Sequence, residues 1–316
     1  MHNISSVVKT SPIGEHVHQS SQNNAFNVLS VKNVSSAPKT LDDASRTITQ
    51  SIRRFIAEKP YQRMVKTGSL WNGHGLEGQG DIKVLSKNNI RGLYQSLGAL
   101  SQDESKFLSR FLESKMFATH TTSAPVENEN GTVSLFSREK LIDRGILFNT
   151  KNSPEEDISI LGNDDFVFFS LEVGETPKKP SSRFGGEMFR FDFSKPSFTD
   201  ASWLSLAEMR FSSAPHLSRH VQGLTDEEYG KLSKRELPRF GSVFHGADMK
   251  TGIALSLIKD FRDNLSDASR GKLLACSTDD ELNRLVNGMY RPEIKVPRHF
   301  FSDDKVKSNV AKDNKF

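Results

Sequence analysis

The chain has 316 residues, 35% of them hydrophobic, and 43 basic against 39 acidic residues give a net charge of +4. This mixed, mildly basic composition does not indicate a nucleic-acid-binding stripe, and no apolar run reaches the roughly 18–20 residues that cross a bilayer. The single cysteine, Cys276, cannot form an internal disulfide, which is typical of a reducing compartment, and its Leu-Leu-Ala-Cys setting favours a packed hydrophobic residue over a nucleophile.

Residues 1–40 differ in composition from the rest of the chain. Seventeen of these forty residues are Ser, Thr, Asn or Gln, and Glu15 is the only acid. Such a segment cannot bury enough apolar surface to offset its chain entropy, so we expect a disordered tail. The composition suits an N-terminal signal for a type III secretion apparatus and suits an ordinary flexible end equally well.

Helical periodicity predicts a first helix that begins near Asp42 and Asp43 and ends at Pro60. Apolar residues and arginines make this helix basic and amphipathic: Leu41, Ile48, Ile52, Phe55, Arg46, Arg53 and Arg54. A second helical block is predicted over 87–116. Between the two, 73–78 matches GxGxxG, but no hydrophobic strand precedes it and Gly80-Asp81 follows where a helix should begin, so a loop is favoured over a dinucleotide-binding turn.

The middle of the chain has the composition of strands. Residues 117–122 predict a strand, Asn130-Gly131 a hairpin turn, and 132–136 the strand that returns beside the first. A short helix is expected over 138–144. Residues 166–171 are apolar on both faces, which predicts a central strand, and 188–193 alternate as a further strand.

The last third predicts helices over 248–262 and 280–290, followed by a strand over 292–297. Pro292 and Pro297 at its two ends favour an edge position in the sheet. Helices first, a strand-rich middle, then helices and a closing strand give an α+β fold.

Few residues carry recognisable chemistry. No HExxH sequence or Cys/His cluster suggests a metal site, and no GxSxG or Walker A sequence occurs. His120 lies among the hydroxyls of Thr119, Thr121 and Thr122, a group that can bind the ribose and amide of a nucleotide, although a buried or exposed structural histidine is more common locally. Glu293 stands on the closing strand, where a carboxylate usually faces water.

Several of these segments resemble, in order, the OspC family of type III secreted effectors, the arginine ADP-riboxanases. The matching residues are Phe117-Ala118-Thr119-His120, Asn163-Asp164-Asp165-Phe166-Val167-Phe168-Phe169, Phe184-Gly185, Gly246-Ala247-Asp248-Met249-Lys250-Thr251-Gly252-Ile253-Ala254-Leu255 and Glu293-Ile294-Lys295-Val296-Pro297-Arg298. The resemblance implies an ADP-ribosyltransferase-like fold with an N-terminal helical region and C-terminal helices. It divides the chain into a secretion tail (1–40), a catalytic domain (41–302, with a helical part 41–116 and an NAD-binding part 117–302) and a polar tail (303–316).

By position, the resemblance implies that Glu293 is the catalytic glutamate. It implies NAD contacts from His120, Thr121, Thr122, Val126, Leu141, Asn152, Phe169, Phe184 and Asp200. Two departures stand out. Family members have a histidine two positions after the glutamate, where this chain has Lys295, and they continue into ankyrin repeats that help to select caspases, where this chain has its polar tail.

The implied reaction splits NAD, attaches ADP-ribose to an arginine of a host protein such as a caspase, and then expels ammonia as a ring closes. The family also uses host calmodulin as an activator, and the basic helix over 41–57 resembles a calmodulin target, with a solvated basic face as the alternative. Two other functions stay open: a simple arginine mono-ADP-ribosyltransferase, and a non-catalytic effector that binds and blocks a host protein in the host cytoplasm.

Overall fold

The computed structural model describes residues 40–150, 155–209, 217–219 and 221–313. The expected tail, up to residue 39, and Asn152 lie outside these ranges. The helices are α1 (Leu41–Thr67), α2 (Gln79–Leu97), α3 (Gln102–Glu113), α4 (Arg138–Asp143), α5 (Glu155–Leu161), α6 (Pro196–Thr199), α7 (Asp226–Ser233), α8 (Asp248–Asn264), α9 (Asp267–Leu274) and α10 (Asp279–Met289). The strands are β1 (Met116–Thr122), β2 (Val133–Phe136), β3 (Phe166–Val173), β4 (Ser181–Ser182), β5 (Glu187–Asp192), β6 (Trp203–Ser205), β7 (Val243–His245), β8 (Glu293–Pro297), β9 (His299–Ser302), β10 (Val306–Asn309) and β11 (Ala311–Lys312).

A sheet of seven strands, in the order β10-β5-β1-β3-β8-β6-β7, forms the centre of the described structure, and every pair in it is antiparallel. Together with the helices that precede, interrupt and follow the strands, it makes an α+β fold, as the sequence predicts. None of the described helices is both long and apolar enough to cross a membrane.

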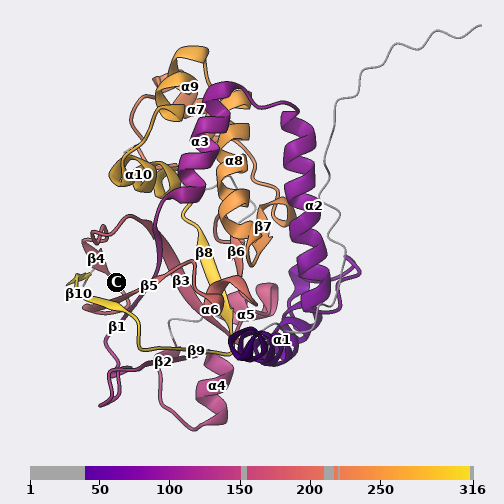
Figure 1. Ribbon diagram of the computed structural model, residues 1–316, viewed down its shortest axis with the longest axis vertical. Helices are drawn as coiled ribbons and strands as arrows, with labels where there is room; N and C mark the ends of the chain where they lie inside the picture. The colour runs from indigo at the N-terminus through magenta and orange to yellow at the C-terminus, as the bar shows by residue number, and fades with distance from the viewer. Residues whose placement is uncertain (1–39, 151–154, 210–216, 220, 314–316) are drawn as a thin grey trace, which may run out of the picture.

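Each face of the sheet has its own hydrophobic core, because side chains alternate along a strand. One face packs against α3, α8 and α10, with Leu171, Phe191 and Ile294 among its buried residues. The other face packs against α1 and the short helix Ser69–Trp71 through Phe166 and Trp203. In Figure 1, α1 is seen nearly end-on at the foot of the sheet, and α2 and α8 stand beside each other above it.

Four predicted elements differ from the observed ones. Pro60 does not end the first helix: α1 continues to Thr67, because Tyr61, Met64 and Val65 beyond the proline are buried in the second core. The helical block over 87–116 is two helices, separated at Gly98, whose φ is +59°, and at Ser101, which caps α3.

The turn at Asn130-Gly131 is confirmed, since Glu127 and Val133 form an antiparallel bridge across it, but the strand over 133–136 pairs with β9, so the expected pairing with β1 is wrong. The strand that carries Glu293 is wrongly placed at an edge: β8 lies between β3 and β6. Its prolines are compatible with this position, since Pro292 precedes the ladder and Pro297 is its last residue.

Residues 73–78 form a loop as predicted, but α2 begins directly after it at Gln79, so Gly80-Asp81 does not prevent a helix there, contrary to the prediction. A dinucleotide-binding turn is still unsupported, because a helix and not a strand precedes the loop. Within the expected polar tail, β10 pairs with β5, which joins residues 306–309 to the central sheet, and β11 pairs with β4 in a separate sheet of two strands.

The Asn163-Asp164-Asp165 segment fixes the start of β3. Arg63 of α1 donates to both carboxylate oxygens of Asp164, at 3.0 and 2.7 Å. Arg298, which follows β8, donates to Asp165 at 2.9 Å, and Ser137 donates to the other oxygen of that carboxylate at 2.6 Å. Two buried acids therefore join α1, β3 and the end of β8, and each is paired as burial of a charge requires.

Gly252 of α8 is predicted to tolerate no side chain. A Cβ at this position would lie 2.3 Å from the ring of Phe244, which is fully buried. Gly252→Ala should therefore lower the free energy of unfolding by about 1–3 kcal/mol through overpacking.

The control is Gly92→Ala in α2, where a Cβ would meet nothing within 4 Å. Relief of glycine's backbone entropy should leave that variant as stable as the native protein or about 0.5–1 kcal/mol more stable. Urea unfolding monitored by circular dichroism measures both; equal midpoints for the two variants would contradict the packing at Gly252.

Candidate active site

A row of polar residues crosses four strands of the sheet around Glu293. The register pairs Ser170 of β3 with Thr119 on one side and with Glu293 on the other, and Glu293 pairs in turn with Ser205 of β6. Directly paired residues point to the same face of a sheet, so these four side chains share the face that α1 partly covers. Ser170 is exposed and the Glu293 side chain is 30% exposed, so solvent reaches this face beyond the edge of the second core.

Lys295 is buried beside Glu293 and holds its carboxylate. The side chain is 1% exposed, and Nζ lies 2.5 Å from Oε2 of Glu293 and 3.0 Å from Oγ of Ser205. The ammonium also lies over the rings of Trp203, at 4.3 Å, and Phe168, at 5.7 Å. Two aromatic faces, one hydroxyl and one carboxylate thus replace water around this cation, and the ion pair keeps Oε2 of Glu293 on the buried side of its carboxylate.

His120 lies where the sheet divides. The β1–β3 ladder ends at Thr119–Ser170, whereas β1 continues beside β5 as far as Thr122 and β3 continues beside β8 as far as Phe166. We call this opening between His120–Thr122 and Phe166–Phe169 the sheet fork. Nδ1 of His120 lies 2.9 Å from the carbonyl oxygen of Phe168.

Because a carbonyl only accepts, Nδ1 of His120 carries the proton in this bond and Nε2 is left as an acceptor in the neutral ring. Burial, and secondarily the positive charge of Lys179, lower the pKa of His120, while the bond to Phe168 raises it by less. The imidazole is therefore neutral at pH 7.

Glu293 and His120 are separated by β3. Two strand spacings of about 4.8 Å put their backbones about 10 Å apart, and in a regular ladder the row of Glu293 continues to Thr119, so that His120 faces the opposite side. No hydrogen bond or ion pair between the two side chains is present in the described structure. The sheet fork and the row of Glu293 therefore lie next to each other, but the side chains of His120 and Glu293 are not in contact.

The turn over 182–185 closes one side of the sheet fork. Oγ of Ser182 lies 2.6 Å from Oγ1 of Thr121 and accepts from the backbone N–H of Phe184. Gly185 packs on the backbone of Thr122 so closely that a Cβ would lie 2.0 Å from its carbonyl carbon. The glycine therefore allows Phe184, 39% exposed, to stand at the end of β1.

The other residues implied by the resemblance lie in different surroundings. Phe169 is buried between Phe198 and Phe300, with its ring 5.6 Å from that of His120. Val126 follows β1 and packs on the first core, and Leu141 lies half-buried on α4. Asp200 precedes β6, where Gln50 and Arg53 of α1 bind its carboxylate. The structure thus groups His120, Thr121, Thr122 and Phe184 at the fork.

Sequence reasoning did not single out Ser170 and Ser205. Ser205 lies on β6, a strand of three residues that was not predicted, and only the register reveals that both serines flank Glu293. Buried Arg190, which donates to Glu172 at 3.0 Å, was missed as well, although Phe189-Arg190-Phe191 interrupts an apolar run with a charge. This pair holds β5 and β3 together on the Glu293 face.

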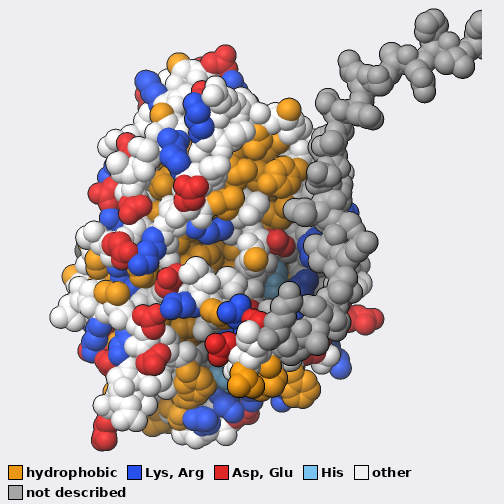
Figure 2. Space-filling view, in the orientation of Figure 1, with side chains coloured by type: hydrophobic (Ala, Val, Ile, Leu, Met, Phe, Trp, Pro, Cys, Tyr) orange, Lys and Arg blue, Asp and Glu red, His pale blue; other side chains and the backbone are white. Residues whose placement is uncertain are grey.

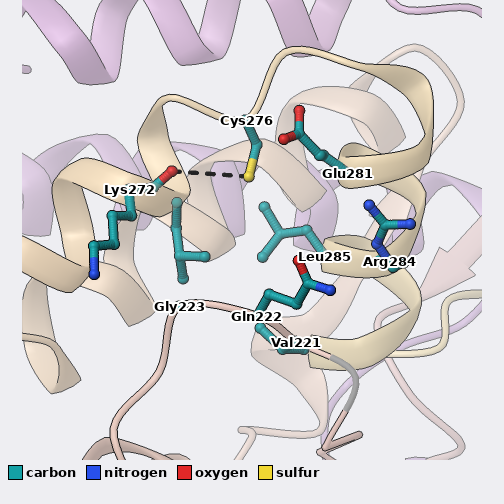
Figure 3. Close-up of a pocket in the computed structure, with 9 residues that line it drawn as sticks. Val221, Gln222, Gly223, Lys272, Cys276, Glu281, Arg284 and Leu285 are labelled. Carbon is teal, nitrogen blue, oxygen red and sulfur yellow. Dashed lines mark hydrogen bonds between the residues drawn. The ribbon is translucent and has the colours of Figure 1, made fainter.

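Cys276 lines a cavity of about 290 Å³ between α9, α10 and the segment 221–223. Its Sγ lies 3.9 Å from the carbonyl oxygen of Lys272, as Figure 3 shows, and burial raises the pKa of the thiol. The thiol is thus protonated at pH 7, and Cys276 packs against the first core as the sequence favoured.

Comparisons with known proteins point to one group of enzymes. No known family profile matches the chain. The chain is 25% identical to the arginine ADP-riboxanase OspC1 of Shigella flexneri, over 82% of this chain and 60% of that protein. It is 24% identical to OspC3 of the same species, over 88% and 63%, and 23% identical to the arginine ADP-riboxanase CopC of Chromobacterium violaceum, over 84% and 59%. The chain thus spans about 60% of the length of these curated relatives.

His245 of β7, in the same row as Lys295 and Trp203, gives a prediction on pH dependence. Burial, together with the charges of Lys83 and Arg54, lowers its pKa to about 3. Below the ordinary histidine pKa of about 6.5, His245 binds a proton in the unfolded chain but not in the folded protein. The free energy of unfolding therefore falls as the pH falls. Between pH 7 and pH 5 this one residue should cost about 2 kcal/mol in free energy of unfolding.

Urea unfolding at the two pH values measures this loss. His245→Gln should lose about 2 kcal/mol less than the native protein on acidification, whereas His74→Gln, an exposed control, should lose as much as the native protein. An identical loss in the native protein and in His245→Gln would contradict the buried neutral histidine.

Proposed function

Because the chain belongs to the OspC family of arginine ADP-riboxanases, we propose that it uses NAD to ADP-riboxanate an arginine of a host protein. The observation that carries the proposal is Glu293, held by Lys295 on an accessible face of the sheet beside the sheet fork. We propose an ADP-ribosyltransferase-like fold for residues 41–302; the antiparallel sheet, with Glu293 on β8 and His120 where β1 and β3 part, supports it.

NAD would lie across the end of β3, with its nicotinamide riboside toward Glu293. At the fork, His120 and Thr122 share one face and offer the Nε2 acceptor and a hydroxyl, which suit ribose hydroxyls and an amide, while Thr121 would offer its hydroxyl on the face of Glu293. The ring of Phe184, over which Arg183 lies at 4.8 Å, would stack on a flat ring of the ligand. Among the other implied contacts, Val126, Leu141, Asn152 and Asp200 remain proposals, and buried Phe169 would act by supporting His120.

Cleavage of the nicotinamide–ribose bond develops positive charge on the ribose. A carboxylate preorganised beside the sugar stabilises that charge, and one such electrostatic contact is worth about 3–4 kcal/mol. Lys295 is paired with Glu293 before NAD binds, so little reorganisation is needed as the bond breaks. The arginine nucleophile is protonated at neutral pH, so Glu293 would also accept its proton during attack.

The second chemical step depends on Lys295, which replaces the family's histidine. Ring closure by a ribose hydroxyl expels ammonia, and a neutral base assists by taking the hydroxyl proton. An ammonium that is ion-paired with Glu293 has no lone pair to accept a proton. This favours a second candidate function, a simple arginine mono-ADP-ribosyltransferase. Its product keeps the guanidinium nitrogen that the riboxanase reaction would release as ammonia.

The remaining proposals concern the cell. We propose secretion by a type III apparatus and action in the host cytoplasm on a host protein, with a caspase as the first candidate. The mass added to a target arginine distinguishes the two enzymatic products by one ammonia, and no added mass would favour a non-catalytic effector that binds and blocks its target.

Glu293→Gln tests the catalytic role. The amide keeps the size of the side chain but cannot stabilise cationic ribose, so nicotinamide release from NAD should fall by about 10²–10³-fold. Glu175→Gln, which follows β3 at the end away from the fork and is paired with Lys115, is the matched control and should retain native activity. Nicotinamide is quantified by chromatography; native turnover by Glu293→Gln would refute the assignment.

Calmodulin is proposed as an activator, with α1 as its target. The helix exposes Leu41, Ile48, Ile52 and Phe55, the last with 83% of its surface accessible. Figure 2 shows hydrophobic side chains at the surface at the foot of the molecule, around the position of α1 in Figure 1. An apolar stripe flanked by arginines suits an acidic groove that binds amphipathic helices.

Ile52→Ser/Phe55→Ser should abolish stimulation of NAD turnover by calmodulin and leave the unstimulated rate within about twofold, since both side chains face solvent. Leu147→Ser, at an exposed residue outside α1, should respond as the native protein does. Equal native rates with and without calmodulin would remove this partner.

A further inference from the structure

A second cavity, of about 350 Å³, lies where α1, α2, β7 and α8 meet. Its lining residues come from four separate parts of the chain: Arg54 from α1, Lys83 and Lys87 from α2, Thr199 and Asp200 before β6, and His245, Gly246, Ala247 and Asp248 at the β7–α8 turn. Neither the catalytic role of Glu293 nor the fold requires this concentration of cations.

The charges around the cavity are not balanced internally. Of its two lining acids, Asp200 is paired with Arg53 and accepts from Gln50, whereas Asp248 accepts, within the described structure, only from the neutral hydroxyl of Ser86, at 2.9 Å, and is the one negative charge among the lining residues that remains to offset the cations. No salt bridge joins Arg54, Lys83 or Lys87 to an acid among the described residues. Three basic side chains therefore face one small volume and repel one another.

Two titrating groups in the cavity respond to this positive field. Burial lowers the pKa of Lys83 most, and the charge of Arg54 lowers it further; Glu58 raises it by more than Lys87 lowers it, and Asp200 raises it least. Burial, and then the charges of Lys83 and Arg54, depress the pKa of His245, which is 6% exposed, so the imidazole adds no charge, and its Nε2 is engaged by Gln79 at 3.2 Å. An anion would relieve the repulsion among the three cations.

The local backbone suits an anion as well. Ala247 is the N-terminal flanking residue of α8, a helix of 17 residues, and no side chain caps its first turn. Amide N–H groups at a helix start carry partial positive charge and bind phosphate oxygens. Gly246, with φ of +58°, lets the chain turn there at a point where a Cβ would lie 2.6 Å from the carbonyl oxygen of Thr199.

We propose that this cavity is a phosphate-binding site, with Arg54, Lys83 and Lys87 as its cationic ligands. The phosphate belongs either to a separate phosphorylated small molecule or to NAD bound in the opposite direction from the one proposed above, with its ADP portion extending from the Glu293 row past β6 instead of across β3. The assignment of the cavity to phosphate does not depend on the proposed function, since it rests on charge and shape alone.

Isothermal titration calorimetry with inorganic phosphate, at constant ionic strength and pH 7.5, tests the site. The native protein should bind one phosphate, and Lys83→Gln/Lys87→Gln should bind it at least about tenfold more weakly because two charge-assisted contacts are gone. The matched control, Lys59→Gln/Lys66→Gln, removes the same charge from exposed positions on α1 outside the cavity and should bind within twofold of native.

Lys83→Arg/Lys87→Arg restores both charges and should restore binding, which separates loss of a ligand from loss of the fold. Repeating the titrations with NAD identifies the source of the phosphate: affinity that falls with the Gln pair indicates NAD, and unchanged affinity indicates a separate phosphorylated ligand. Absence of saturable phosphate binding to the native protein, or equal binding by the Gln pair, would overturn the proposal.

Discussion

The ion pair between Lys295 and Glu293 is the contact on which the candidate site depends. A lysine with 1% of its side chain exposed needs partners that replace water. Lys295 contacts one carboxylate, one hydroxyl and two aromatic rings. The carboxylate therefore cannot rotate freely into solvent, although its own side chain is 30% exposed. A fixed negative charge at an accessible edge of a core is what stabilisation of a cationic sugar requires.

The two hydrophobic cores make this arrangement possible. Apolar residues on one face of β8 pack under α8 and α10, while Lys295 on the other face lies against Phe168 and Trp203 at the limit of the core under α1. Asp164 and Asp165 bind arginines from α1 and from the chain after β8, which sets where β3 begins and hence which residue stands opposite Glu293. The pairing register of β3 with β8 thus connects the structural acids Asp164 and Asp165 with the candidate catalytic acid, Glu293.

Local sequence signals predicted the strongly periodic elements and failed where tertiary packing decides. The apolar run at 166–171 and the four-residue repeat of α8 were recognised, because those patterns are properties of single segments. The pairing of β2 with β9, the interior position of β8 and the continuation of α1 through Pro60 depend on partners distant in sequence. In the site, Glu293 and His120 could be named from the resemblance, but Ser170, Ser205 and the fork could not, because only the register creates them.

The most direct test of the account is a crystal structure of the Glu293→Gln variant with NAD bound, since the variant should bind NAD and cleave it slowly. The account predicts the nicotinamide ribose within hydrogen-bonding distance of the residue 293 amide, with the dinucleotide crossing the end of β3 toward His120. A dinucleotide bound elsewhere, with the row of Thr119, Ser170, residue 293 and Ser205 in contact only with solvent, would contradict it.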